Sequence, residues 1–184
     1  MFISMTKSIK LNSGKIITMR DEINSKKKKY WSYIKAENLL SKKEIKAGYR
    51  THDLKELYNE ITQMAEKLVY IKGMLFYLNM GETTFDKEKF KKTNNYSIFM
   101  ACELKEQIAQ LKMIPTLDPK TKAQKGLKNI AKEEIFTSAK IAALIKDLQL
   151  KSNKCDTDME NFNNNTEISI DESMNDMFKT DIAA

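Results

Sequence analysis

A run of basic residues leads directly into aromatic residues in the first part of the chain. The lysines are Lys26, Lys27, Lys28 and Lys29, and the rings that follow are Tyr30, Trp31 and Tyr33. Adjacent positive charges can contact the phosphates of a nucleic acid, and rings can stack on its bases. In a helix, however, four consecutive side chains point all round the cylinder, and the three rings fall on its apolar face. The pattern favours core packing over base stacking, and both interpretations stay open.

A second set of lysines lies around residues 120–132. Its members are Lys120, Lys122, Lys125, Lys128 and Lys132. The last three share one face at helical spacing, which suits a phosphate backbone or an acidic protein surface. A solvated lysine face has the same pattern. The candidate contacts for nucleic acid or an acidic partner are therefore the four lysines of the first run with Lys125, Lys128 and Lys132.

Residue types that carry catalysis or bind metals are sparse and scattered. His52 is the only histidine, and Cys102 and Cys155 lie far apart in the sequence, so they form no recognisable zinc ligand set. The adjacent carboxylates Glu133 and Glu134 are typical of the acidic first turn of a helix. The sequence has no glycine-rich phosphate loop, nucleophile elbow or dinucleotide fingerprint. We expect no enzyme, no cofactor and no metal site; an enzyme would need a pocket that converges on His52 or on a buried carboxylate.

The most regular feature of the chain is a heptad seam. Eight apolar residues follow one another three and four positions apart: Leu54, Leu57, Ile61, Met64, Leu68, Ile71, Leu75 and Leu78. A helix turns every 3.6 residues, so this spacing puts them on one stripe that must pack against another helix. Their types at the a and d positions do not match a parallel dimer, which favours the core of an intramolecular bundle. Self-assembly through the seam is the alternative.

Towards the end of the seam, between Leu68 and Leu78, the helix is apolar on nearly all sides. The extra apolar residues there are Val69, Tyr70, Met74, Phe76 and Tyr77. Such a helix is either covered by further helices of its own chain or docks a partner on its open side. These five residues are our candidate partner contact.

Few helix breakers interrupt the chain, since only five glycines and two prolines occur among 184 residues. The spacing of apolar residues predicts four helices, at about 19–47, 52–80, 97–113 and 127–150. The short link after the first of them favours an antiparallel pairing of the first two helices. The predicted fold is all-α: a long antiparallel helical hairpin extended into a coiled-coil-like helical bundle over residues 19–151.

Local signals set the expected ends of these helices. Thr51 is the expected N-cap of the second helix. Asn94 and Asn95 are expected to interrupt the helical structure before the third helix. Gly14 lies between two short alternating stretches, which predicts a small β-hairpin, or else an irregular arm, over residues 1–18.

The composition changes at residue 152. Residues 152–184 are rich in asparagine and carry eight acids against two lysines, which predicts a disordered acidic tail and leaves the body strongly basic. Within the tail, three apolar residues recur every four positions and predict a short amphipathic helix that forms on binding a groove. These candidate docking residues are Met174, Phe178 and Ile182.

Together these patterns predict a non-enzymatic structural, scaffold or adaptor protein that assembles through helical packing. The expected setting is a virion, a phage particle or another multi-subunit complex, with a protein partner or further copies of the chain. The alternative is a nucleic-acid-binding protein whose basic body is gated by the acidic tail. No apolar run reaches the roughly 18–20 residues of a membrane span, and the N-terminus lacks a secretory signal. We therefore expect a protein of the cytoplasm or of a particle assembled inside the cell, with no small-molecule substrate.

Overall fold

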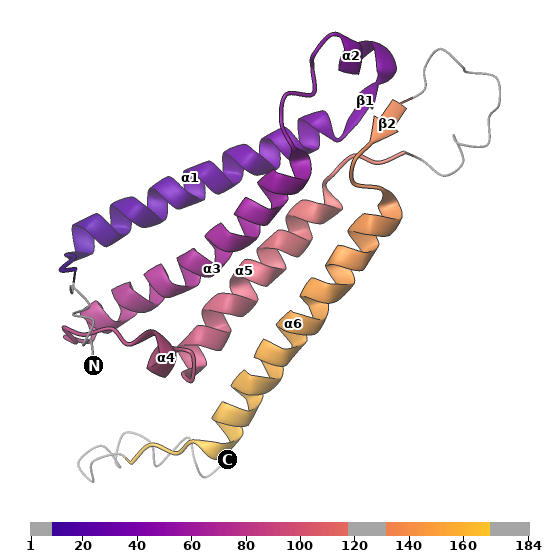
Figure 1. Cartoon of the computed structure of the whole chain (residues 1–184). Coiled ribbons are helices and arrows are strands. Elements are labelled where there is room, and N and C mark those ends of the chain that lie inside the picture. Colours follow the sequence, from indigo (N-terminus) through magenta and orange to yellow (C-terminus); the bar gives the residue numbers. More distant parts are fainter. Residues whose placement is uncertain (1–8, 118–131, 170–184) are drawn as a thin grey trace, which may run out of the picture.

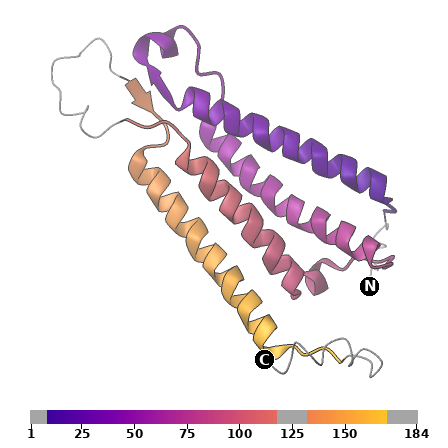
Figure 2. The same ribbon diagram turned by 180° about the vertical axis from the view of Figure 1, so that it is seen from behind.

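The computed structural model describes residues 9–117 and 132–169. Four long helices run side by side with alternating direction, as Figure 1 and Figure 2 show. They are α1 (Ser13–Glu37), α3 (Leu54–Asn79), α5 (Asn94–Lys112) and α6 (Ser138–Asn165). α1 packs along α3, α3 along α5, and α5 along α6. The predicted mostly helical bundle is confirmed. No helix in this part of the chain is long and apolar enough to span a bilayer.

Short elements lie at both ends of the bundle. Two strands, β1 (Leu39–Ser41) and β2 (Lys132–Glu134), pair antiparallel and form a small ribbon at one end. α2 (Lys42–Lys46) follows β1 at this same end, and α4 (Lys87–Phe90) lies at the opposite end between α3 and α5 (Figure 1). The sequence did not reveal the ribbon, because each strand has only three residues and pairs with a segment far away along the chain.

The heptad seam lies inside the bundle. Six of its residues are buried, whereas Leu75 and Leu78 are half-buried. The first four seam residues form one core cluster with apolar residues of the other long helices, which include Trp31, Ile34, Leu104, Leu111, Ile141 and Leu148. Burial of each large apolar side chain stabilises the fold by about 1.5–3 kcal/mol. The seam therefore packs against helices of its own chain.

Aromatic residues of the same chain cover the far end of α3. Phe90 is fully buried, and a Cβ atom at Gly73 would lie 2.5 Å from its ring. The other rings of this aromatic cluster are Tyr70, Tyr77, Phe85, Tyr96 and Phe99. Among the candidate partner contacts, Val69 is buried, and the four others are half-buried: Tyr70, Met74, Phe76 and Tyr77. Phe90 of α4 and the first turns of α5 thus occupy much of the surface that the sequence left open to a partner.

The predicted β-hairpin near the N-terminus is wrong for the residues that the structure describes. α1 already begins at Ser13, because the Asn12 side chain accepts a hydrogen bond from the Lys15 N–H at 2.9 Å and caps the helix. Gly14 lies in the first helical turn, and positive φ angles occur at other glycines. Residues 1–8 lie outside the described part of the chain.

The first two long helices are shorter than predicted. α1 ends at Glu37 and not near residue 47, because the Asn38 side chain binds distant backbone groups and the chain continues into β1. Asp53, and not Thr51, is the N-cap of α3, since its carboxylate accepts two N–H groups of the first turn. The Thr51 hydroxyl donates to Glu37 instead.

The starts of the last two long helices also differ from the prediction. The Thr93 side chain caps α5, so Asn94 and Asn95 form the first residues of this helix instead of interrupting the helical structure. The helix predicted over residues 127–150 is wrong at its start, because β2 comes first and the Thr137 side chain then caps α6. Residues 127–131 lie outside the described part of the chain.

The disordered tail predicted over residues 152–184 is wrong for residues 152–165, and residues 170–184 lie outside the described part of the chain. Residues 152–165 belong to α6, where Ser152 and Cys155 are buried and Asp156 pairs with Lys105 of α5 at 2.9 Å. Composition concealed this part of the helix, because its few buried residues are spaced among exposed acids and amides. The candidate docking residues of the tail lie outside the described part of the chain: Met174, Phe178 and Ile182.

Candidate functional site

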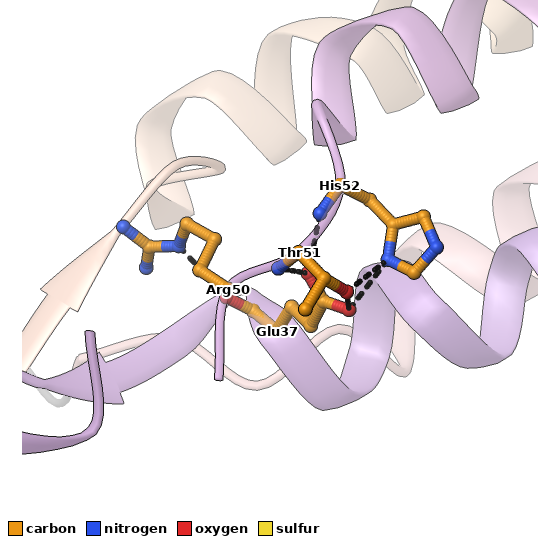
Figure 3. Close-up of polar contacts among 4 residues, drawn as sticks. All are labelled: Glu37, Arg50, Thr51 and His52. Carbon is orange, nitrogen blue, oxygen red and sulfur yellow. Dashed lines mark hydrogen bonds and ion pairs between the residues drawn. The ribbon is translucent and has the colours of Figure 1, made fainter. Parts of the chain in front are cut away.

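A buried carboxylate organises the end of the bundle that carries the ribbon. The side chain of Glu37 is only 10% exposed and accepts four hydrogen bonds from the loop before α3 (Figure 3). Its Oε2 accepts the backbone N–H groups of Thr51, at 2.8 Å, and His52, at 3.1 Å. Its Oε1 accepts the Thr51 hydroxyl, at 2.9 Å, and binds His52 Nδ1, at 2.6 Å. We name Glu37, Asn38, Arg50, Thr51 and His52 the polar junction.

The carboxylate of Glu37 orients the imidazole of His52. An ionised carboxylate only accepts hydrogen bonds, so His52 Nδ1 carries a proton, and Nε2 of the neutral ring is an acceptor. The ring stacks on Tyr33 with 4.0 Å between the centroids. An imidazole held in this way can act as a general base where a substrate reaches Nε2. All the contacts that fix the ring come from the end of α1 and its neighbouring loop.

Asn38 and Arg50 tie the ribbon to the bundle. Asn38 is fully buried; its amide donates to the carbonyl oxygens of Pro115, at 2.8 Å, and Phe136, at 3.0 Å, and accepts the Phe136 N–H at 2.7 Å. The Arg50 guanidinium donates to two carbonyl groups at the end of α1 and to that of Glu133 in β2. The polar junction therefore fixes the ribbon to the ends of α1 and α5 and to the start of α6.

The pKa of Glu37 makes the polar junction sensitive to acid. Burial alone would raise this pKa, but the hydrogen bonds from His52 and Thr51 outweigh it and hold the pKa below its ordinary value of 4.5. The unfolded chain therefore takes up a proton at a higher pH than the folded chain. The stabilisation by Glu37 is complete above its unfolded pKa and is lost as the pH falls through its folded pKa.

Replacing Glu37 with glutamine is expected to lower the free energy of unfolding by about 1–3 kcal/mol at neutral pH, because an amide cannot accept all four donors and brings donors of its own. The difference from the unmodified chain should shrink as the pH falls below about 4.5. Urea unfolding followed by circular dichroism between about pH 3 and 7 measures both effects. A difference that stays constant over this range would contradict the role of the Glu37 charge.

A group of exposed lysines lies on the ribbon that the polar junction holds. Lys42 and Lys43 begin α2 and Lys46 ends it, while Lys132 begins β2 opposite Ser41 in register. We name Lys42, Lys43, Lys46 and Lys132 the basic tip. Within the described residues, the three lysines of α2 form no ion pair. The basic tip is thus a cationic surface whose position is fixed by the fold.

Two of the three acids next to the basic tip are engaged within the fold. The Glu44 carboxylate accepts the N–H and the hydroxyl of Ser41, each at 2.7 Å. The Ser41 side chain and N–H, with the nearby charge of Lys132, hold the pKa of Glu44 below its ordinary value. Glu134 accepts a backbone N–H from the segment after α5. Glu44 and Glu133 are both exposed, so an approaching anion meets both of these carboxylate charges beside the lysines.

The structure separates the four lysines of the first basic run. Lys27 is 1% exposed, and its Nζ lies 2.6 Å from Glu103 and 2.7 Å from Glu106 of α5. Lys72 of α3 contacts the other oxygen of Glu103 at 2.8 Å. These residues form an ion cluster that joins three helices. Lys27 is therefore inaccessible to nucleic acid.

The other lysines of this run lie on the surface of α1. Lys26 pairs with Glu60 of α3 at 3.0 Å. Lys28 and Lys29 are exposed, and the Lys29 charge lies over the Tyr33 ring. Trp31, in contrast, is 2% exposed, so this ring cannot stack on a base. Of the second lysine set, Lys125 and Lys128 lie outside the described residues, and only Lys132 can be placed.

A groove of about 550 Å³ runs between α1 and α5. Its lining residues are Lys28, Trp31, Ser32, Lys35, Ala36 and Gln110. Lys35 Nζ contacts Gln110 Oε1 at 2.6 Å across the groove. None of the lining residues belongs to the polar junction, so the groove does not converge on His52 or on Glu37.

Sequence reasoning missed the lysines of α2 and the residues that hold them. One local signal was present, because Ser41 followed by Glu44 has the capping-box pattern that starts α2. The contacts of Asn38 and Glu37 had no such signal, since their partners are loop groups placed by the fold.

Comparison with known proteins gives no further guide. No protein-family model, no curated protein and no solved structure matches this chain.

Proposed function

We propose that this protein is a non-enzymatic adaptor whose helical bundle presents the basic tip to an acidic partner. The observation that carries the proposal is the pairing of β1 with β2. This pairing places Lys132 opposite Ser41, next to Lys42, at one end of the bundle. The ribbon thus joins lysines from two distant segments on one surface.

The contrast between the basic tip and the first basic run supports this assignment. In α1, Lys27 is buried against two carboxylates and Lys26 is paired with Glu60, so their charges serve the fold. In α2, the lysines are exposed and form no ion pair within the described residues. Exposed, unpaired cations at a fixed position attract an anionic partner and increase its rate of association.

The position of the heptad seam makes the tip preferable to self-assembly through the seam. The first four seam residues pack in the core that the four long helices share. Their apolar surface is therefore already used within the chain. An adaptor built on this bundle has to engage its partner through another surface.

The proposal is tested by neutralising the basic tip. A tip variant carries Lys42→Gln, Lys43→Gln, Lys46→Gln and Lys132→Gln. A control variant loses four exposed lysines from the sides of the bundle, through Lys15→Gln, Lys28→Gln, Lys112→Gln and Lys146→Gln. Each variant loses four positive charges. Binding of a short heparin oligosaccharide, a polyanion without bases, is measured by isothermal titration calorimetry at about 50 mM salt, where surface charges are weakly screened.

We expect the tip variant to bind heparin about tenfold more weakly, because each exposed ion pair contributes about 0.3–0.5 kcal/mol and four are lost. The control variant should bind within about threefold of the unmodified chain. Removing one of the two exposed acids, through Glu133→Gln, should tighten binding, a gain that partial unfolding cannot produce. Equal losses in the tip and control variants, or no binding by the unmodified chain, would refute the proposal.

A further inference from the structure

An exposed tyrosine stands beside the basic tip. Tyr49 follows α2 and precedes Arg50, and it is 65% exposed. The other six tyrosines of the chain are all half-buried. A large ring that is left in water between cationic residues adds little to the stability of the fold. The face of this ring is therefore open to a ligand.

The backbone of Tyr49 is fixed although its ring is exposed. Gly48 has a φ angle of 81°, which reverses the chain at the end of α2 and suits glycine. The Gly48 N–H donates to the carbonyl of Ile45 at 3.0 Å, and the Tyr49 N–H donates to that of Glu44 at 3.1 Å. The ring is thus carried by an ordered turn, so a ligand that binds it has little backbone to order.

We infer that the basic tip binds single-stranded nucleic acid, with the Tyr49 ring as the platform on which one base stacks. The inference rests on the proposed function of the basic tip and names the chemistry of its partner. Lysines contact phosphates, and an adjacent exposed ring accepts the face of an unpaired base. A duplex hides the faces of its bases, and an acidic protein surface engages lysines without requiring a ring.

The test compares one aromatic deletion on several polyanions. Full-length chains carrying Tyr49→Ala or Tyr49→Phe are titrated into a fluorescein-labelled thymidine oligonucleotide, a duplex of the same length and the heparin oligosaccharide. Fluorescence anisotropy reports binding. The matched control is Phe162→Ala, which removes an exposed ring elsewhere, on α6. Circular dichroism checks that every variant is folded.

We expect Tyr49→Ala to weaken binding of the thymidine oligonucleotide at least fivefold and to leave heparin binding within about twofold. Tyr49→Phe keeps a ring and should bind like the unmodified chain, as should Phe162→Ala. The tip variant should show a salt dependence of oligonucleotide binding that is shallower by about 3 in the logarithmic slope, since each phosphate contact on a single strand contributes about 0.7.

The outcomes separate this inference from the proposed function. If the Tyr49→Ala variant binds the oligonucleotide with the same affinity as the unmodified chain, while the tip variant binds heparin more weakly, the proposed function of the tip stands and base stacking is refuted. Equal affinity for oligonucleotide, duplex and heparin would identify a general polyanion surface, as an acidic protein would use, and would also refute the inference. If the unmodified chain binds none of the three polyanions, both proposals fail.

Discussion

Replacing Lys27 with methionine is expected to lower the free energy of unfolding by about 3 kcal/mol, one of the two largest effects of a single change in this protein. Methionine fills a similar volume but removes the charge that meets Glu103 at 2.6 Å in the interior. Glu103, whose side chain is 4% exposed, then keeps Lys72 as its cationic partner. The effect therefore lies at the lower end of the range for breaking a buried ion pair. Urea unfolding followed by circular dichroism measures it.

Neighbouring residues supply the controls for this prediction. Lys28→Met makes the same substitution one position later on the exposed surface of α1 and should change stability by less than about 0.5 kcal/mol. The double variant Lys27→Met with Glu103→Met also removes the buried Glu103 carboxylate, which has lost Lys27 as its partner in the single variant. This variant should be more stable than the sum of the single changes predicts, by about 1–3 kcal/mol. Equal unfolding midpoints for Lys27→Met and Lys28→Met would show that the ion cluster does not stabilise the bundle.

Replacing Phe90 with alanine is expected to cost about 3–5 kcal/mol of stability, the usual range for removing a fully buried ring. The ring closes the far end of the bundle by lying against Gly73, where the absence of a side chain makes room for it. Loss of Phe90 leaves a cavity between α3 and α5. Thermal and urea unfolding of the variant measure the loss.

The contact between Gly73 and Phe90 permits a sharper test. Gly73→Ala alone should destabilise the protein by about 1–3 kcal/mol, because its Cβ would lie 2.5 Å from the Phe90 ring. In a Phe90→Leu background, the same change should cost less, since the smaller side chain leaves space. Gly14→Ala is the matched control, because only the Asn12 side chain comes within contact distance, at 3.6 Å; it should be neutral or stabilising by up to about 1 kcal/mol. The prediction is wrong if Gly73→Ala behaves like Gly14→Ala.

The long helices could be predicted because their signals are local. The apolar spacing from Leu54 to Leu78 predicted nearly the whole of α3, because the pattern and the helix occupy the same continuous segment. The ends of the helices were less predictable. At residue 38, an asparagine side chain replaces helical hydrogen bonds with bonds to Pro115 and Phe136, and no local pattern reports such partners.

The burial of Lys27 had a signal that is visible only in retrospect. Lys27 lies four positions after Ile23 and four before Trp31, on the stripe of α1 that also carries Ile34. Periodicity therefore places it on the inner face. Its charge argued against burial, because a buried lysine needs carboxylate partners. Those partners come from α5, and only the packing of α1 near α5 brings them within reach.

The basic tip could not be predicted from the sequence for a related reason, because it joins segments that are far apart along the chain. The lysines of α2 lie within the helix that the sequence predicts over residues 19–47, and no pattern there sets them apart from the other lysines of that segment. The three-residue strands that unite them with Lys132 are too short to show a period. The polar junction, whose residues come from the end of α1 and the loop before α3, ties this ribbon to the bundle through hydrogen bonds to Glu133 in β2 and to Phe136 before α6.

The most direct test of the basic tip is a residue-by-residue NMR titration of the full chain, labelled with nitrogen-15, by the short heparin oligosaccharide at about 50 mM salt, where surface charges are weakly screened. We expect the largest amide shift changes at residues 42–50 and 132–134, with small changes along the sides of the bundle. Largest changes at residues 28–36 and at Gln110 would instead place the ligand in the groove between α1 and α5 and would contradict the basic tip as the binding surface.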